Sequence, residues 1–229
     1  MGQQEAVMEK LDIVYDPELD KSVVEMNFIE KVEIQGDHVH VIMRLPTYWC
    51  SPNFAFIMAE DIRERVMEIP WVKRVTVNLK DHSASEAINN GVAEGKSFSE
   101  VFRDMASGDL DEVRKKFQIK SFMARQETLL RDLMNSGMDA GSLLKLTWPE
   151  LESHSAIQDR AVLQRYLTLC KELGLSQKAH DLAFKRHTGE EIAPSELTDY
   201  LLEARRTRMS MEFNATYCRG LLEARYQTT

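Results

Sequence analysis

The segment LPTYWCS, residues 45–51, contains the cysteine whose place in the chain could do chemistry. Cys50 follows an alternating apolar pattern typical of a strand and comes just before an amphipathic helical pattern that starts near Pro52. A thiolate just before a helix is stabilised by unpaired amide groups and by the positive end of the helix dipole, which favours a nucleophile or a soft-metal ligand. The alternative is that Cys50 packs as a small apolar residue beside Trp49.

The rest of the sequence excludes several classes of function. Cys170 and Cys218 lie in apolar helical patterns and are predicted to be core residues, and no two cysteines form a CxxC pair. Phosphate-binding loops, dinucleotide fingerprints and nucleophile elbows are absent from the sequence. An enzyme that acts on a small molecule is therefore the alternative with the least support, because no nucleophile–base pair can be assembled from the sequence, and we expect no enzyme activity. A net charge of -8 argues against a nucleic acid partner, and the short apolar runs argue against a membrane span. We expect a soluble intracellular protein.

Residues 1–80, which carry Cys50, are predicted to form an α+β domain. A helical pattern precedes Asp16, and from Phe28 the apolar period changes to two, with turn residues at 35–37, which predicts a β-hairpin. The helix after Pro52 stops at Pro70, and another strand pattern follows. The predicted order is α-β-β-α-β, a three-stranded mixed sheet with helices packed on it, since a strand–helix–strand link permits a parallel pair.

The remainder is predicted to be a linker followed by an all-α domain. Residues 81–96 lack sustained periodicity and contain Asn, Gly and Ser, which predicts the linker. Residues 97–229 have helical patterns nearly throughout. The predicted helices are 98–105, 110–117, 122–135, 140–145, 157–173, 177–187 and 195–226. The last is apolar around much of its surface, so it either closes the core of the helical domain or forms an interface.

The chain up to Leu79 resembles the small iron-sulfur cluster assembly factors of the SufT and PaaD type. The resemblance rests on VYDPEL at residues 14–19, on the hairpin, on Thr47 and Cys50 in the loop, and on IPWVKRV at residues 69–75. It covers about a third of the chain, and the C-terminal helical domain is not part of it.

The resemblance implies a cytoplasmic accessory factor that helps to deliver iron or an iron-sulfur cluster to a client metalloenzyme. Cys50 matches the reactive cysteine of the family, and Asp16 and Glu18 match its acidic turn, so these three are the metal ligands that the resemblance implies. The cargo would be bound transiently, and a second subunit, as in a homodimer, would be needed because one cysteine cannot saturate a cluster that usually takes four ligands. The alternative is that Asp16 accepts backbone amides in a solvated turn.

The chain departs from the family pattern in the loop. Tyr48 and Trp49 stand where relatives have small residues, so they would either crowd a metal at Cys50 or, with Thr47, contact a partner protein. Asn27 and Phe28 replace part of an Asn-Leu-Gly turn, which removes the conformational freedom of glycine. Helices replace the cysteine-rich tail of PaaD.

Two hypotheses of function follow. In the first, the protein is a maturation factor for a metalloenzyme, with an iron-dependent monooxygenase as the client that the PaaD resemblance implies. In the second, it is a metal-free adaptor or chaperone that stabilises an apo-oxygenase or another multi-subunit enzyme through Tyr48, Trp49 and the helices. Replacement of Cys50 by serine separates the two, because only a transfer factor should then lose client activation.

Overall fold

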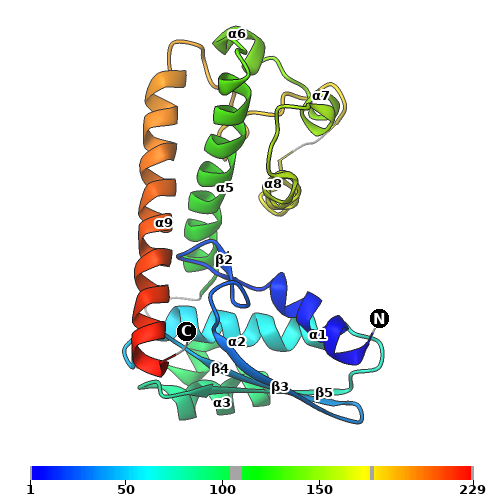
Figure 1. The fold of residues 1–229 in the computed structure, drawn as a ribbon, viewed down its shortest axis with the longest axis vertical. Coiled ribbons are helices and arrows are strands. Elements are labelled where there is room, and N and C mark those ends of the chain that lie inside the picture. The colour runs from blue at the N-terminus through cyan, green and yellow to red at the C-terminus, as the bar shows by residue number, and fades with distance from the viewer. Residues whose placement is uncertain (1, 104–109, 176–177, 228–229) are drawn as a thin grey trace. The chain divides into compact units, whose positions relative to one another are not determined.

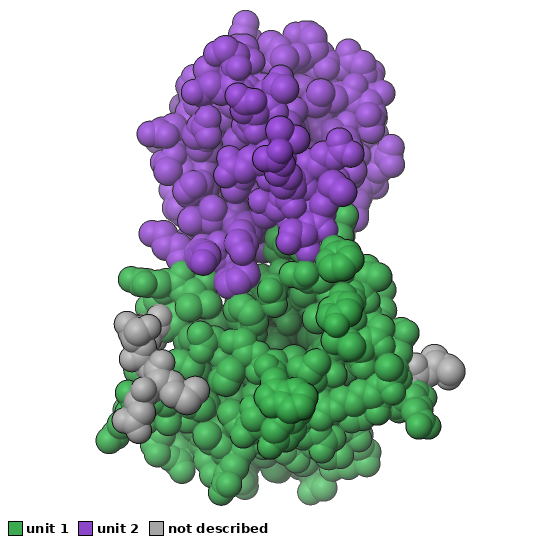
Figure 2. Space-filling view, turned by 90° about the vertical axis from the view of Figure 1, so that its left-hand side faces the viewer, with its two compact units in different colours: residues 1–114, 211–229 green, residues 115–210 purple. Residues whose placement is uncertain are grey.

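The computed structural model describes residues 2–103, 110–175 and 178–227, and the chain divides into two compact units (Figure 2). Unit 1 consists of residues 1–114 and 211–229, and unit 2 consists of residues 115–210. The long helices α5 (Leu110–Asn135) and α9 (Leu197–Tyr226) each contribute to both units. The division therefore lies inside two helices. The boundaries 1–80 and 97–229 stay predictions for the extent of independently folding domains.

Unit 1 is built on a three-stranded sheet with the order β3-β4-β5 (Figure 1). Strands β3 (Ile29–Gln35) and β4 (His38–Arg44) form the predicted antiparallel hairpin around Gly36, whose φ of 64° lies in the region that favours glycine. Strand β5 (Arg74–Lys80) runs parallel to β4 and is reached through helix α2 (Pro52–Met67). This confirms the predicted α+β fold with a mixed sheet.

The core of unit 1 joins the sheet to its helices. Alternate residues of β4 and β5 are buried, and they pack in one cluster with the buried faces of α2 and of α1 (Gln3–Asp12). Alternation of this kind is what a sheet with one covered face requires. Asn27 precedes β3 with a φ of 57°, and because asparagine tolerates this left-handed region, the chain makes the turn without a glycine.

A short hairpin precedes the main sheet. Strands β1 (Tyr15–Asp16) and β2 (Lys21–Ser22) pair antiparallel. The Oδ1 atom of Asp16 accepts hydrogen bonds from the amides of Glu18 at 2.8 Å and Leu19 at 3.1 Å, and its carbonyl accepts the amide of Asp20 at 3.0 Å. The acidic turn is thus organised by its own first carboxylate, as in an Asx turn.

Helix α3 (Ser85–Glu94) lies in the segment 81–96 that we predicted as a linker, so most of that segment is helical. Its buried residues Ile88 and Val92 are one helical turn apart, a signal too short to stand out in the sequence. Asn89 accepts the amide of Leu79 at 2.8 Å and donates to its carbonyl at 3.2 Å. The side-chain amide therefore satisfies the backbone hydrogen-bonding groups of Leu79 on the outer edge of β5, where the described residues form no further strand.

Glycine 91 brings α3 close to helix α4 (Phe98–Val101). A Cβ atom at Gly91 would lie 2.3 Å from Cγ2 of Val101 and 3.5 Å from Cε2 of Phe56. The first distance is far below van der Waals contact, so the absence of a side chain permits this packing.

Unit 2 is helical and has its own core. It contains parts of α5 and α9 together with α6 (Ala140–Leu143), α7 (Trp148–Ser153) and α8 (Arg160–Glu172). Phe122, Tyr166 and Phe184 are among its largest fully buried side chains. The interior also holds an ion pair, in which Nε of Arg208 lies 2.5 Å from Oε2 of Glu127. The prediction of a helical C-terminal region is therefore confirmed.

Several helix predictions need correction. The helices predicted at 110–117 and 122–135 form the single helix α5, because residues 118–121 contain neither glycine nor proline. Residues 178–187 form turns and bridges, Thr147 with Leu182 and Lys185 with Glu191, instead of the predicted helix. Residues 104–105 and 177, which end or begin predicted helices, lie outside the described residues. Of the helices described, none is both long enough and apolar enough to cross a membrane.

Candidate functional site

Two loops leave the sheet at the same end, because β4 and β5 are parallel and Arg44 pairs with Lys80 in register. The first loop, residues 45–51, carries Cys50, and the second begins at residue 81. Their backbones are joined by a hydrogen bond from the amide of Ser83 to the carbonyl of Tyr48 at 2.9 Å. The parallel pair is thus what brings the cysteine loop beside a segment that is distant in sequence.

His82 in the second loop fixes the backbone of Cys50. Its Nδ1 atom accepts the amide of Ala84 at 3.1 Å, so the proton lies on Nε2, which donates to the Cys50 carbonyl at 2.7 Å. Burial, aided by the positive charge of Arg225, lowers the pKa of His82 and keeps the ring neutral. The sequence analysis missed His82. Its position directly after a strand parallel to the one before Cys50 is the signal that could have indicated it.

The cysteine loop places its side chains on two sides. Thr47 Oγ1 lies 3.4 Å from the sulfur of Cys50, and Cys50 lies just before Ser51, the N-cap residue of α2. Tyr48 and Trp49 are 46% and 79% exposed and pack edge to face with ring centroids 5.6 Å apart. Neither aromatic residue lines the pocket beside Cys50, so they do not crowd it. Their role as a partner contact stays a prediction.

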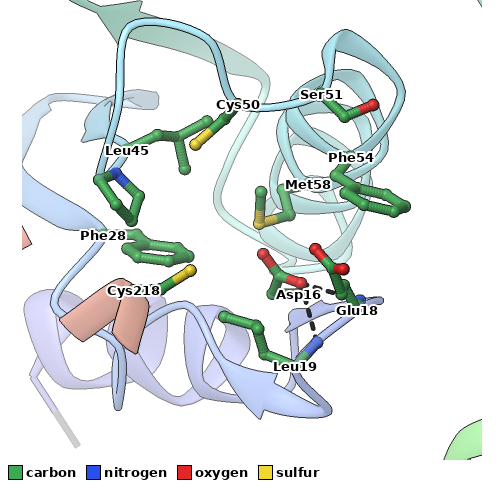
Figure 3. Close-up of a pocket in the computed structure, with 11 residues that line it drawn as sticks. Asp16, Glu18, Leu19, Phe28, Leu45, Cys50, Ser51, Phe54, Met58 and Cys218 are labelled. Atoms are coloured by element: carbon green, nitrogen blue, oxygen red, sulfur yellow. Dashed lines mark hydrogen bonds between the residues drawn. The ribbon is translucent and has the colours of Figure 1, made fainter. Parts of the chain in front are cut away.

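Cys50 borders a pocket of about 90 Å³ in unit 1 (Figure 3). A cavity needs roughly 10–15 Å³ to hold one water, so the pocket has room for a cation with water ligands. The residues that line it come from the acidic turn, the residue before β3, the cysteine loop, α2 and α9: Asp16, Glu18, Leu19, Phe28, Leu45, Pro46, Cys50, Ser51, Phe54, Met58 and Cys218. The structure therefore brings together the three residues proposed as ligands from the sequence.

Asp16 is the most perturbed acid of the pocket. It is only 7% exposed, and burial raises the pKa of its carboxyl from 3.8 to about 7, although the amides of Leu19 and Glu18 act in the opposite direction. Asp16 thus accepts backbone amides, as one interpretation predicted, but it is buried and not solvated. A carboxylate that is costly to ionise in an apolar pocket gains strongly from a bound cation.

Cys218 is a lining residue that the sequence analysis did not place in the site. It is half-buried. Figure 3 shows that the sulfur atoms of Cys218 and Cys50 both face the pocket. Burial, followed by the negative charges of Asp16, Cys50 and Glu18, raises the pKa of the Cys218 thiol to about 11. Cys218 packs against the core of unit 1, as predicted, but it also lines the pocket, which was not predicted. Cys170 is fully buried in unit 2, as predicted.

The last turn of α9 holds the two loops together. Arg225 donates to the carbonyl of Leu45 at 3.1 Å and to that of Asp81 at 2.7 Å, so it bridges the ends of the parallel strands. The hydroxyl of Tyr226 donates to the Asp81 carboxylate at 3.3 Å, and the Arg44 guanidinium lies 4.5 Å from the centre of the Tyr226 ring. The end of α9 is therefore an integral part of unit 1.

The donors around the pocket form a mixed set of two thiols and two carboxylates. Soft sulfur and hard oxygen ligands together suit borderline metals such as iron and zinc. Within the described part of the chain, no three His, Cys, Asp or Glu side chains converge closely enough to hold an ion.

The fold and this pocket define a class of small α+β domains in which a loop cysteine and an acidic turn meet at one pocket. Comparison with known proteins makes the class specific: residues 4–79 match the family described as iron-sulfur cluster assembly protein. This confirms the resemblance seen in the sequence for an N-terminal domain of that family, which includes the acidic turn and the cysteine loop. Cys218 and the end of α9 lie outside the match.

A curated relative supports the same assignment. The N-terminal region is similar to the iron-sulfur cluster carrier protein of Synechocystis sp., with 41% identity over 75 residues. These residues are 33% of this chain and 21% of the relative, so the chain spans about a fifth of the length of that protein. The similarity therefore concerns one domain of each chain.

Proposed function

We propose that the protein is an accessory factor that delivers iron or an iron-sulfur cluster to a client metalloenzyme, with Cys50 as the thiolate that carries the cargo. The observation that carries this proposal is the pocket that Cys50 shares with the carboxyl groups of Asp16 and Glu18. The family match over residues 4–79 supports a role in handling iron-sulfur clusters. The proposed location is the cytoplasm.

The pocket residues would act by ligand exchange. Cys50 supplies a soft ligand and the two carboxylates supply hard ones, while the hydroxyl of Thr47, 3.4 Å from the sulfur, can donate to the thiolate. Protons leave Cys50 and Asp16 when the cargo binds, and they return when it leaves. A site without a closed ligand set releases its cargo readily to a client that has one. This is transfer without turnover, so we propose that the protein is not an enzyme.

The proposed client is an iron-dependent monooxygenase, on the basis of the PaaD resemblance. Trp49, 79% exposed at the tip of the cysteine loop, and its neighbour Tyr48 offer an aromatic contact for such a protein. Aromatic side chains of this kind often anchor protein interfaces. A homodimer that completes the ligand set stays part of the proposal.

A metal-free adaptor is the second candidate. Two observations favour it: the exposed aromatic pair, and the lack of three converging metal donors in the described part of the chain. An adaptor would bind and stabilise an apo-oxygenase or another multi-subunit enzyme through these aromatic residues, with Cys50 dispensable.

Anaerobic purification of the wild type and of Cys50→Ser tests the proposal. Iron and acid-labile sulfide would be quantified and an absorption spectrum recorded after reconstitution. Cys170→Ala provides a control, because Cys170 is buried in the core of unit 2 and does not line the pocket. Iron near one equivalent or above in the wild type and in the control, and lost in Cys50→Ser, supports delivery. Folded protein without iron in every form contradicts it and favours the adaptor.

A further inference from the structure

We propose that Cys218 is a second thiol ligand of the same pocket, so that one chain supplies two sulfur ligands to a thiophilic divalent cation such as Fe²⁺ or Zn²⁺. The inference rests on the proposed function, since it takes metal binding at Cys50 as its starting point. It goes further because Cys218 lies outside the family match and because it gives the C-terminal helix a chemical role.

The position of Cys218 follows from the face that α9 buries in unit 1. Ala215, Cys218, Leu222 and Tyr226 recur at intervals of three and four residues, and all four pack with the core of unit 1. Residues at this spacing share one face of a helix. Cys218 thus brings a thiol to this mainly apolar packing face, at the point where the face meets the pocket.

Two arginines of α9 fix this face in register with the pocket. Arg225 donates to the carbonyls of Leu45 and Asp81 at the ends of both parallel strands, about two helical turns beyond Cys218. Arg219, the next residue after Cys218, lies 3.8 Å from the Glu25 carboxylate in a solvent-exposed pair. Because Leu45 lines the pocket, the bond from Arg225 positions the helix that carries Cys218 against the cysteine loop. Such positioning lowers the entropy cost of binding.

The chemistry of the surroundings fits a cation. Cys218 shares the pocket with the thiol of Cys50 and with the carboxyl groups of Asp16 and Glu18. A divalent cation in the pocket would favour the ionised form of each of these groups, because it offsets their negative charges. Binding would replace two S–H bonds by two metal–sulfur bonds and release both protons to solvent, so no oxidant or reductant is needed. Asp16 and Glu18 line the same pocket and would supply oxygen ligands if their side chains moved toward the bound ion, since zinc and clusters usually take four ligands.

Cobalt(II) tests the inference, because its thiolate complexes have an ultraviolet charge-transfer band whose intensity follows the number of sulfur ligands. The metal-free full chain would be titrated anaerobically with Co²⁺ as wild type, Cys50→Ser, Cys218→Ser and the double variant. Cys218→Ala and the control Cys170→Ala would be treated alike, with circular dichroism to confirm folding. Mass measurement by light scattering would follow each titration.

The inference predicts a band that falls by about half in each single variant and disappears in the double variant. It also predicts a Kd for Co²⁺ that rises roughly tenfold or more in Cys218→Ser, since even partners that only orient a metal ligand contribute 10–100-fold. A band lost in Cys50→Ser but unchanged in both Cys218 variants overturns the role of Cys218 and leaves the proposed function intact. The same holds if the loaded wild type is a dimer bridged by Cys50 alone. Absence of any band in the wild type contradicts the proposed function itself.

Discussion

Replacement of Asp16 by asparagine should stabilise unit 1 at neutral and alkaline pH. The Oδ1 atom of asparagine can still accept the amides of Glu18 and Leu19, so the turn keeps both hydrogen bonds. What the substitution removes is a negative charge in a position that is 7% exposed and that also faces the acidic groups Glu18 and Cys218. The stability of the metal-free protein therefore depends on whether this carboxyl is ionised.

The size of the effect follows from the pKa of Asp16. Folding raises it from 3.8 to about 7, a shift of about 3 units, and one unit corresponds to 1.36 kcal/mol. Because the raised pKa belongs to the folded state, the folded protein binds the proton more tightly than the unfolded chain. The resulting stability is fully present below pH 3.8 and is lost as the pH rises through about 7. Above that pH, Asp16→Asn should exceed the wild type by up to about 4 kcal/mol.

Urea unfolding between pH 5 and pH 8.5 measures this difference, with a chelator present to keep the protein metal-free. A Trp148→Phe background makes fluorescence specific for unit 1, because Trp49 and Trp71 are then the remaining tryptophans. Trp148 is a suitable residue to replace, since no partner for its indole nitrogen is found among the described residues. The free energy of unfolding of the wild type should fall relative to that of the variant as the pH rises. Parallel curves, or a more stable wild type at pH 8, would refute the reasoning.

Three other substitutions test the packing. Gly91→Ala should destabilise unit 1 by about 1–3 kcal/mol, because its Cβ would lie 2.3 Å from Cγ2 of Val101. Adding Val101→Ala should restore most of this loss, as measured by urea unfolding. A double variant as unstable as Gly91→Ala would contradict the proposed clash. Arg208→Met should lower the free energy of unfolding by roughly 3–5 kcal/mol, because it removes the buried ion-pair partner of Glu127. The double variant with Glu127→Leu should lose much less stability. Equal losses for the two variants in calorimetry would argue against this account. Arg225→Gln should lower the free energy of unfolding by about 1.5–3 kcal/mol for each charged hydrogen bond that is lost. It should also increase amide hydrogen exchange in the cysteine loop and in the loop that begins at residue 81. Unchanged exchange would mean that Arg225 does not hold these loops together.

The part of the pocket that residues 16–58 form could be predicted because it depends on sequence patterns within short segments. The strand, loop and helix around Cys50 are adjacent in sequence, and the Asp16 turn carries its own turn chemistry. The order of these elements was enough to indicate both the mixed sheet and the family. What periodicity did not reveal is that Asp16 is buried, because a short polar turn looks solvated until α2 and α9 cover it.

The remaining features depend on contacts between distant segments. His82 was assigned to a linker, yet the parallel pairing of β4 with β5 places it beside Cys50. Cys218 has no local feature that distinguishes it from Cys170, since both lie in apolar helical patterns. Only the packing of α9 against unit 1 separates a pocket thiol from a core thiol. Residues 178–187 were predicted as helix from their local pattern, but isolated bridges to Thr147 and Glu191 replace the helix there.

The discontinuous composition of unit 1 has a consequence for biosynthesis. Unit 2 is a continuous stretch of chain, whereas unit 1 needs residues 211–227 to return to a sheet that was synthesised long before. Residues 1–114 are synthesised before unit 2 and residues 211–227 after it, so the wall that carries Cys218 should be added late. A nascent chain would then expose Cys50 in an open, incomplete pocket. Under the proposed function, closure of that pocket would make the protein competent to hold a metal.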